Sequence, residues 1–380
     1  MMDRKKYLKG LKRIVIKIGS SSLASRQGSG LDDANLDKLS AEVKQITDMG
    51  LEVIIVTSGA IAAGLKYLDV DKKPEDISFL QAAASVGQVQ LMDKYKEVFS
   101  DKGMRIGQIL VTQEDTTRRR QYLNIKNTIE KLLELGVVPI INENDSSAVE
   151  EIKFGDNDKL AALISSLVES DLLVILTDNE GFYDKDPSSA GDAELISFID
   201  RITPDIEKHA GGIGYKFGSG GMKSKLTAAK ICMLSGIPMM IANSRKEGII
   251  VDLVEGKDIG TLFVSKNSKR LKSMKRWIAF GMRSKGTIML DKGAEKAVKQ
   301  KGKSILAVGI SGVEGDFNKG DTLKVMTHDN HLLAKGISNF SSKEVKRILG
   351  KNKEKILSEF GPDMCVEVIH RDCLVVFEED

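Results

Sequence analysis

Short apolar segments alternate with longer segments of helical periodicity over the first two thirds of the chain. The longer segments place apolar residues three and four positions apart, as in 160–167. The short segments, rich in β-branched residues, are Ile14–Ile18, Val53–Thr57, Ile106–Thr112, Val137–Asn142, Leu172–Thr177 and Met239–Ala242. This alternation predicts an α/β domain with a mostly parallel central sheet sandwiched by helices. Ligands of such sheets bind at the carboxyl ends of the strands, so the residues that follow each strand are the first candidates for function.

After about residue 280 the pattern changes to short strands separated by Gly, Asp and Asn turns. The expected strands are Thr287–Leu290, Ile305–Val308 and Thr322–Met326, with one helix near Ala294–Gln300. Such a succession predicts a small β-rich module.

The stretch 265–278 holds six Lys and Arg residues and no acidic residue. A polar, charge-dense stretch between two regions of mixed charge is typical of a linker. The alternative is a solvated basic helix that caps the first domain, and both interpretations put the domain boundary here. We therefore predict a catalytic domain at 1–264, a basic linker at 265–278 and a β-rich domain at 279–380.

The composition is that of an ordinary two-domain globular protein, with 380 residues, 41% hydrophobic, 29% charged and a formal net charge of +3. No apolar run approaches the roughly 18–20 residues of a membrane helix. The basic N-terminus is followed by an apolar run that Lys17 interrupts, too short for a signal peptide. We expect a cytoplasmic protein that does not insert into membranes.

Cysteine and histidine are both scarce. The three cysteines form no CxxC pair, so neither a disulfide framework nor a zinc site is expected. Of the four histidines only His209 lies in the first 260 residues. A histidine base is therefore not expected in the first domain. Phosphoryl transfer suits this scarcity, because positioning and charge stabilisation carry most of its catalysis.

Two strand ends carry features suited to an anion. Lys17 lies within the first strand and leads to Gly19; a buried lysine needs an anionic partner, although an edge-strand lysine could instead reach solvent. The second strand passes through Ser58 and Gly59 into small helix-forming residues from Ala60. Such a turn exposes backbone N–H groups to an anion, unless it serves only close strand–helix packing.

Acid and amide clusters follow the strand 137–142. The first contains Asn142 and Asp145, and the second runs from Asp156 to Asp158 at the start of an apolar helix. Asp156 or Asn157 could be a simple N-cap. Two such clusters in succession could instead hold an ammonium group, a metal or a lysine.

A glycine-rich segment, Gly218–Lys225, precedes another apolar helix. Its glycines allow backbone amides to approach phosphate oxygens, with Lys225 about one turn into the helix; the alternative is a flexible loop with a solvated lysine. The sequence does not match two familiar nucleotide-binding motifs. The Gly-Lys-Ser at 302–304 has Ala297 in place of the first P-loop glycine, and Lys223 stands where the third glycine of GxGxxG would fall.

Five segments together resemble the amino acid kinase superfamily, specifically its glutamate-phosphorylating members. They are VTSGAIAAG at 56–64, INEND at 141–145, GDND at 155–158, TD at 177–178 and SGGMKSK at 219–225. The resemblance covers essentially the whole chain, since the C-terminal region is similar to a PUA domain. It implies the amino acid kinase fold and transfer of the ATP γ-phosphoryl group to the γ-carboxylate of L-glutamate. The product would be γ-glutamyl phosphate for proline biosynthesis.

The resemblance also implies residue roles. The catalytic set is Lys17, Lys225 and Asp158. The substrate-binding set is Ser58, Gly59, Ala60, Asn142, Asp145 and Asn157. The ATP-binding set is Lys17, Gly19, Thr177, Asp178, Ser219, Gly220, Gly221, Met222, Lys223, Ser224 and Lys225. Asp145 would pair with the α-ammonium group of glutamate, which disfavours N-acetylglutamate. Mg²⁺ is expected on the ATP phosphates, with no residue identified as a metal ligand.

Further partners follow from the resemblance alone. They are proline as a feedback inhibitor, a homo-oligomer (dimer or tetramer) and transfer of the product to glutamyl phosphate reductase. The PUA similarity and the basic linker raise a second hypothesis, an RNA-binding module. Residues 279–380 carry a net charge of only +2 and no basic stripe interleaved with aromatics. We therefore do not expect RNA binding as the main function.

Overall fold

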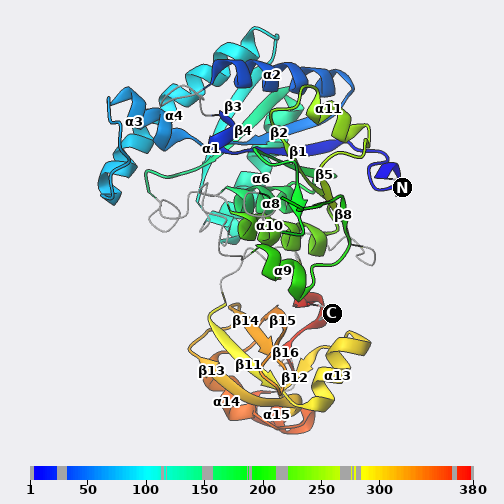
Figure 1. Cartoon of the computed structure of the whole chain (residues 1–380). Coiled ribbons are helices and arrows are strands. Elements are labelled where there is room, and N and C mark those ends of the chain that lie inside the picture. The colour runs from blue at the N-terminus through cyan, green and yellow to red at the C-terminus, as the bar shows by residue number, and fades with distance from the viewer. Residues whose placement is uncertain are drawn as a thin grey trace. The chain divides into compact units, whose positions relative to one another are not determined.

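The computed structural model describes residues 4–23, 32–112, 115–116, 118–147, 157–185, 187, 191–210, 221–265, 275, 278–279, 284–361 and 366–377. The chain divides into two compact units, 1–271 and 272–380 (Figure 1). Most of the predicted linker 265–278 lies outside the described residues. Its role, and the predicted limits of the domains at 264 and 279, therefore stay predictions.

Unit 1 is built on a sheet of eight strands in the order β3-β4-β2-β1-β5-β9-β10-β8. Neighbouring strands are parallel except β9 and β10. The strands are β1 (Arg13–Ile18), β2 (Glu52–Val56), β3 (Arg105–Val111), β4 (Val137–Glu143), β5 (Leu172–Thr177), β8 (Phe198–Ile199), β9 (Met239–Asn243) and β10 (Thr261–Phe263). A separate pair joins β6 (Phe182–Tyr183) to β7 (Leu195–Ile196). The six strands predicted from the sequence are confirmed to within one residue at each end.

Helices cover both faces of this sheet. They are α1 (Ser20–Leu23), α2 (Asp33–Asp48), α3 (Ala60–Tyr67), α4 (Ile77–Ser100), α6 (Arg119–Glu134), α8 (Asp158–Leu167), α9 (Pro204–Ala210), α10 (Met222–Ser235) and α11 (Ile249–Val254). Figure 1 shows α2 and α11 over one face and α8 and α10 over the other. No helix in the described ranges is both long and apolar enough to cross a bilayer.

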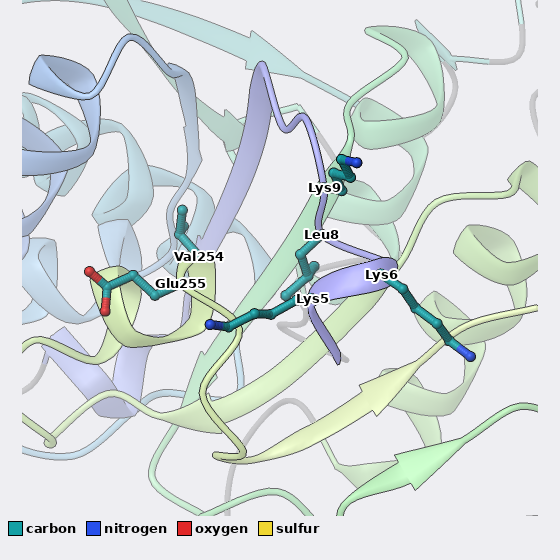
Figure 2. A pocket seen from close by; sticks show the side chains of 6 residues that line it. All are labelled: Lys5, Lys6, Leu8, Lys9, Val254 and Glu255. Atoms are coloured by element: carbon teal, nitrogen blue, oxygen red, sulfur yellow. The ribbon is translucent and has the colours of Figure 1, made fainter. Parts of the chain in front are cut away.

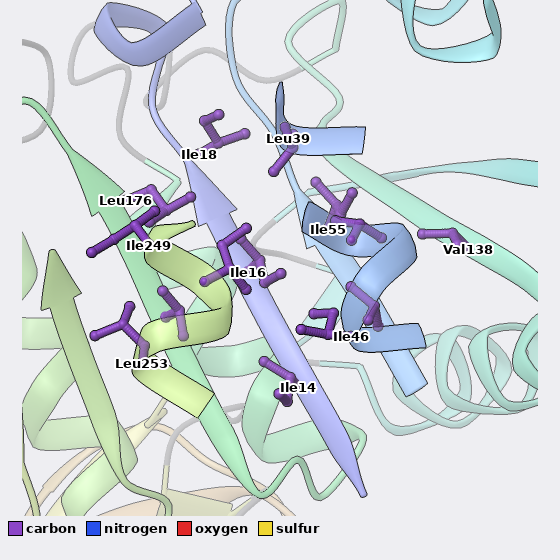
Figure 3. Packing of buried hydrophobic residues seen from close by; sticks show 14 of the residues in the cluster. Ile14, Ile16, Ile18, Leu39, Ile46, Ile55, Val138, Leu176, Ile249 and Leu253 are labelled. Carbon is purple, nitrogen blue, oxygen red and sulfur yellow. The ribbon is translucent and has the colours of Figure 1, made fainter. Parts of the chain in front are cut away.

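The side chains on the two faces of β1 have different surroundings. Ile14, Ile16 and Ile18 pack with α2 and α11 in the apolar core (Figure 3). Because side chains alternate along a strand, Lys17 points to the opposite face, where α8 lies. Lys17 is only 5% exposed, and β1 lies between β2 and β5. The edge-strand interpretation of Lys17 is therefore wrong, and the lysine needs a buried anionic partner.

Two glycines bring α3 and α4 into backbone contact. A Cβ atom added at Gly64 would lie 1.8 Å from the carbonyl oxygen of Ala83, and one at Gly87 would lie 1.8 Å from that of Ala60. No side chain fits in either space, so only glycine permits the crossing. The contact packs the middle of α4 against the first turn of α3.

Unit 2 contains a five-stranded sheet in the order β13-β11-β14-β15-β17 and a two-stranded pair of β12 and β16. The strands are β11 (Gly286–Leu290), β12 (Ile305–Leu306), β13 (Ile310–Gly315), β14 (Thr322–Met326), β15 (Leu332–Ile337), β16 (Glu367–Ile369) and β17 (Leu374–Val376). The helices are α13 (Lys292–Lys301), α14 (Ser342–Ile348) and α15 (Lys353–Phe360). The β-rich interpretation of this region is confirmed.

Two details of the prediction for unit 2 are wrong. The strand Ile305–Val308 ends at Leu306, because Ala307–Gly309 forms a 3₁₀ turn. Gly309 packs there against Ala294, since a Cβ at Gly309 would lie 2.4 Å from the Cβ of Ala294. The region also holds three helices in its described part and not one. The two that the sequence pattern missed are short, and begin at side-chain caps from Ser341 and Asn352.

Candidate active site

Four neighbouring strands bring the predicted residues to one edge of the sheet. In spatial order these are Asn142 in β4, Ser58 after β2, Lys17 in β1 and Thr177 at the end of β5. Strands lie 4.7–4.9 Å apart, so the row spans about 14 Å. The residues predicted to bind glutamate lie on one side of Lys17, and Thr177, predicted to bind ATP, lies on the other.

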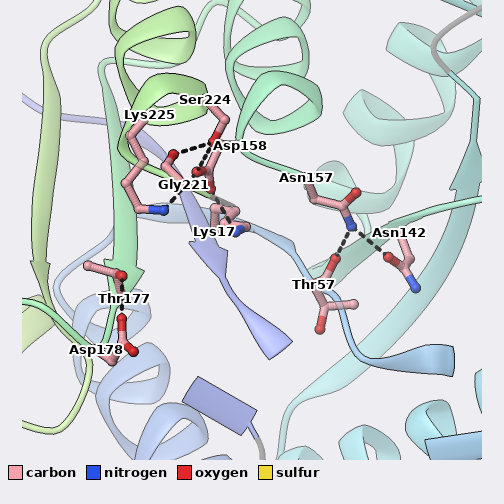
Figure 4. Close-up of polar contacts among 10 residues, drawn as sticks. All are labelled: Lys17, Thr57, Asn142, Asn157, Asp158, Thr177, Asp178, Gly221, Ser224 and Lys225. Atoms are coloured by element: carbon pink, nitrogen blue, oxygen red, sulfur yellow. Dashed lines mark hydrogen bonds and ion pairs between the residues drawn. The ribbon is translucent and has the colours of Figure 1, made fainter. Parts of the chain in front are cut away.

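A buried carboxylate joins the two predicted lysines. Asp158 Oδ1 lies 2.6 Å from Lys17 Nζ, and Asp158 Oδ2 lies 3.1 Å from Lys225 Nζ (Figure 4). Ser224 Oγ donates a third contact to Oδ2 at 3.0 Å. Asp158 opens α8, whereas Ser224 and Lys225 lie in the first turn of α10. One acid thus ties β1, α8 and α10 together at the carboxyl edge of the sheet.

The charge state of this cluster follows from its partners. Burial by itself raises the pKa of Asp158, but Lys17 and Lys225 outweigh burial and hold that pKa well below its ordinary value. An ionised carboxylate between two ammonium groups leaves one net positive charge in a nearly solvent-free position. Such a site favours an anion, because the low local dielectric strengthens its attraction.

Gly19 lies directly after the strand, beside this charge. A Cβ atom at Gly19 would stand 3.6 Å from Lys17 Nζ, which is an ordinary van der Waals distance. The predicted residue Gly19 is therefore next to the lysine, but the space around it does not require a glycine.

On the other side of Lys17 the site is built from neutral amides. Asn157 Nδ2 donates to the carbonyl oxygen of Thr57 at 2.6 Å and to Asn142 Oδ1 at 2.9 Å. Asn157 occupies the N-cap position of α8 but makes no side-chain cap bond. The N-cap interpretation is therefore wrong for Asn157, whose amide instead fastens the ends of β2 and β4 to each other.

Helix α4 completes this amide cluster. Asn142 Nδ2 donates to Gln88 Oε1 at 2.8 Å, and the Tyr95 hydroxyl lies 2.9 Å from Thr57 Oγ1. Complete burial raises the pKa of Tyr95, which therefore stays protonated. Gln88 and Tyr95 are seven residues apart, two turns on one face of α4. Sequence reasoning missed both, because their contacts span 54 and 38 residues and no local motif marks them.

The turn after β2 lies beside the amide cluster. Gly59 has φ +105°, a left-handed conformation that favours glycine, and α3 begins directly afterwards at Ala60. Ser58 is buried, and its Oγ has no hydrogen-bond partner among the described residues. Asp145 lies half-buried in the turn after β4, three residues beyond Asn142. The predicted substrate residues that the structure describes thus share one end of the strand row.

The predicted nucleotide residues occupy the other end. Thr177 Oγ1 donates to Asp178 Oδ1 at 3.1 Å at the end of β5. Gly221 precedes α10 without a side-chain cap, Met222 is buried and Lys223 is exposed. The predicted residues Ser219 and Gly220 lie outside the described residues, as does Asp156. The described part of the segment therefore offers an uncapped helix N-terminus near the paired lysines, which suits phosphate oxygens.

Comparison with known proteins agrees with this geometry. A model of the amino acid kinase family matches residues 12–243, and a model of the PUA domain matches residues 286–360. The chain belongs to the amino acid kinase family.

Relatives within this family are similar over nearly the whole chain. The glutamate 5-kinase of Syntrophotalea carbinolica is 43% identical, over 98% of this chain and 99% of the relative. That of Caldanaerobacter subterraneus subsp. tengcongensis is 44% identical, over 96% and 98%, and that of Syntrophus aciditrophicus is 43% identical, over 98% and 96%. The resemblance inferred from the five motifs and the PUA-like C-terminal region is confirmed.

A kinase of this family also raises the question of a metal. In the described ranges, no three His, Cys, Asp or Glu side chains are placed to hold an ion. Asp158, the acid nearest the lysines, is engaged by both of them. These residues do not fit a protein-built magnesium cage. Mg²⁺ commonly keeps several waters and binds substrate phosphates, a mode of binding that needs no such cage.

A separate pocket of about 420 Å³ lies outside this site (Figure 2). Its lining comes from the segment before β1 and from the end of α11, and consists of Lys5, Lys6, Leu8, Lys9, Val254 and Glu255. These residues lie toward the amino end of β1, whereas the family's motif residues gather at its carboxyl end. The pocket does not belong to the candidate active site.

Proposed function

We propose that this chain transfers the γ-phosphoryl group of ATP to the γ-carboxylate of L-glutamate, the first step of proline biosynthesis. The products are ADP and γ-glutamyl phosphate. The observation that carries the proposal is the order of the strand ends, with the paired lysines between an amide-lined end and an uncapped helix N-terminus. The near full-length similarity to glutamate 5-kinases supports the choice of substrate.

The residues suit this reaction. An oxygen of the γ-carboxylate bonds to the γ-phosphorus, and the bond from that phosphorus to the oxygen of departing ADP breaks. A glutamate side chain has an ordinary pKa of about 4.3 and is already ionised at neutral pH, so no general base is needed. Lys17 and Lys225 face the negative charge of the moving phosphoryl group. Asp158 holds both ammonium groups in place.

The two ends of the site bind the two substrates. Asp145 would pair with the α-ammonium group of glutamate, with Ser58, Asn142 and Asn157 around the same molecule. Thr177, Asp178 and the start of α10 would hold ATP with its Mg²⁺. Proline inhibition, a homo-oligomer and transfer of the product to glutamyl phosphate reductase stay predictions from the resemblance. A cytoplasmic location stays a prediction from the pattern of apolar residues along the chain.

A trapping assay tests the proposal. Hydroxylamine attacks an acyl phosphate and yields a hydroxamate, so ATP, Mg²⁺, L-glutamate and hydroxylamine should give γ-glutamyl hydroxamate. The same reactions with L-aspartate and N-acetyl-L-glutamate, together with ADP release measured for all acceptors including UMP, define the specificity. Turnover of any of these three acceptors without turnover of L-glutamate would overturn the proposed substrate.

A further inference from the structure

The orientation of the Gln88 amide is determined by backbone groups. The carbonyl of Thr57 can only accept, so the atom of Asn157 that faces it is the donor Nδ2. The N–H of Glu143 can only donate, at 2.9 Å, so the atom of Asn142 that faces it is the acceptor Oδ1. Asn142 therefore presents Nδ2 to Gln88, so the atom of Gln88 that accepts this hydrogen bond is Oε1.

In this orientation the hydrogen-bond donor of the Gln88 amide remains unused. Gln88 Nε2 is buried and has no hydrogen-bond partner among the described residues, as is also true of Ser58 Oγ. A buried N–H or O–H group without an acceptor is costly, so such groups in a native site call for an explanation. Two leftover donors in one polar cluster are complementary to an acceptor with several lone pairs, such as a carboxylate.

The fold places Gln88 at the substrate end of the strand row. The tight contact of Gly87 with Ala60 and Gly64 sets α4 directly behind the turn that holds Ser58. The partner of Gln88, Asn142, lies in β4, which is two strands away from β1. Gln88 therefore lies on the β4 side of the row, on the far side of Asn142 and Asn157 from the lysine pair around Asp158.

We infer that Gln88 is a substrate-binding residue whose side-chain NH₂ donates to the α-carboxylate of glutamate. The inference rests on the proposed function. The γ-carboxylate must point toward the phosphoryl group that Lys17 and Lys225 face, so the carboxylate at the β4 end is the α one. Gln88 then acts twice: Oε1 orients Asn142, and Nε2 binds the substrate.

Two substitutions separate these two actions. Gln88→Leu removes both the acceptor and the donor. Gln88→Glu keeps an acceptor for Asn142 but replaces the donor with a carboxylate oxygen, whose negative charge would face the α-carboxylate of glutamate. We expect Gln88→Leu to raise KM for glutamate about tenfold to a hundredfold, the range for a hydrogen bond to a charged group. Gln88→Glu should raise it further, because like charges repel. In both variants kcat and KM for ATP should stay within about threefold of wild type.

Matched controls come from Gln45, an exposed residue of α2: Gln45→Leu and Gln45→Glu should leave all constants unchanged. A wild-type KM in Gln88→Glu, with a raised KM in Gln88→Leu, would show that Gln88 only orients Asn142 and would overturn the inference. So would a fall in kcat at unchanged KM. Thermal unfolding of each variant reports on folding. Failure of the wild-type enzyme to phosphorylate glutamate would refute the proposed function itself, whereas normal wild-type turnover with unaffected Gln88 variants would refute only this inference.

Discussion

The two ends of the strand row in the candidate active site are built from different chemistry. Around β1 the structure gathers charge, with Asp158 between Lys17 and Lys225. At the β2 and β4 end, apart from Asp145 in the turn after β4, it gathers neutral groups, in which Asn157 and Asn142 join backbone and α4. Charged side chains stabilise the phosphoryl group, whose charge is redistributed during the reaction. Amides that are held in fixed orientations instead recognise the shape of the substrate and the positions of its hydrogen-bonding groups. We therefore expect changes at the charged end to appear in kcat and changes at the amide end to appear in KM for glutamate.

The largest effect should come from removing the shared acid. Asp158→Asn leaves two buried ammonium groups without their counter-charge, and breaking a buried ion pair in this way typically costs about 3–5 kcal/mol of stability. We expect the free energy of unfolding to fall by about that amount, as measured by denaturant titration, and kcat to fall with it. Asp93→Asn, on the exposed side of α4, is the matched control. A loss below about 1 kcal/mol would contradict the assigned partnership.

The same acid predicts a direction with pH. The pKa of Asp158 is lower in the folded protein than in an unfolded chain, where it is about 3.9. Its contribution to stability is therefore present above that value and is lost as the pH falls toward the folded-state pKa. In acid titrations the wild-type protein should lose stability more steeply than Asp158→Asn.

Next in size are the lysines themselves. Lys17→Ala and Lys225→Ala should each lower kcat about 10²–10³-fold, the usual cost of removing one preorganised group that faces transition-state charge. Steady-state assays of hydroxamate formation measure this effect. Lys44→Ala removes an exposed lysine that is paired with Asp48 on α2 and should change nothing. A wild-type kcat in either active-site variant would remove its assigned role.

The amide end should respond differently. Asn142→Ala breaks the link between Asn157 and Gln88, so we expect KM for glutamate to rise at least about tenfold while kcat stays within about threefold. Asn124→Ala, on an exposed position of α6, is the control. A fall in kcat without a change in KM would erase the proposed difference between the two ends.

How well the sequence predicts a feature depends on how far apart along the chain the interacting residues lie. Strands such as β5 were predicted correctly because burial on both faces leaves a local apolar signature. The motifs around Asn142 and Asp158 were visible because they lie at the end of β4 and at the start of α8. Gln88 could not be found, since its partner lies 54 residues away and its neighbours read only as a small-residue helix. The 3₁₀ turn at Ala307–Gly309 likewise depends on the packing of Gly309 against Ala294 in α13, and the residues around the turn give no sign of that contact.

The smallest effect should come from a buried acid outside both ends. Glu42 of α2 accepts from the backbone N–H groups of Gly248 and Ile250. Burial raises its pKa and outweighs these two hydrogen bonds, which lower it. Stability from this group is thus present below the unfolded pKa of about 4.3 and declines as the pH rises through the folded one. Glu42→Gln should flatten that decline in denaturant titrations without changing kcat or KM; an unaltered pH slope would contradict it.

Binding of glutamate in the absence of nucleotide tests the division between the two ends most directly. Titration calorimetry on the wild-type protein, Lys225→Ala and Asn142→Ala would compare the Kd for glutamate with no catalysis in progress. We predict that Lys225→Ala binds glutamate within about threefold of wild type and that Asn142→Ala binds it at least about tenfold more weakly. Equal weakening in the two variants, or weaker binding in Lys225→Ala alone, would contradict the assignment of charge to phosphoryl transfer and of amides to substrate recognition.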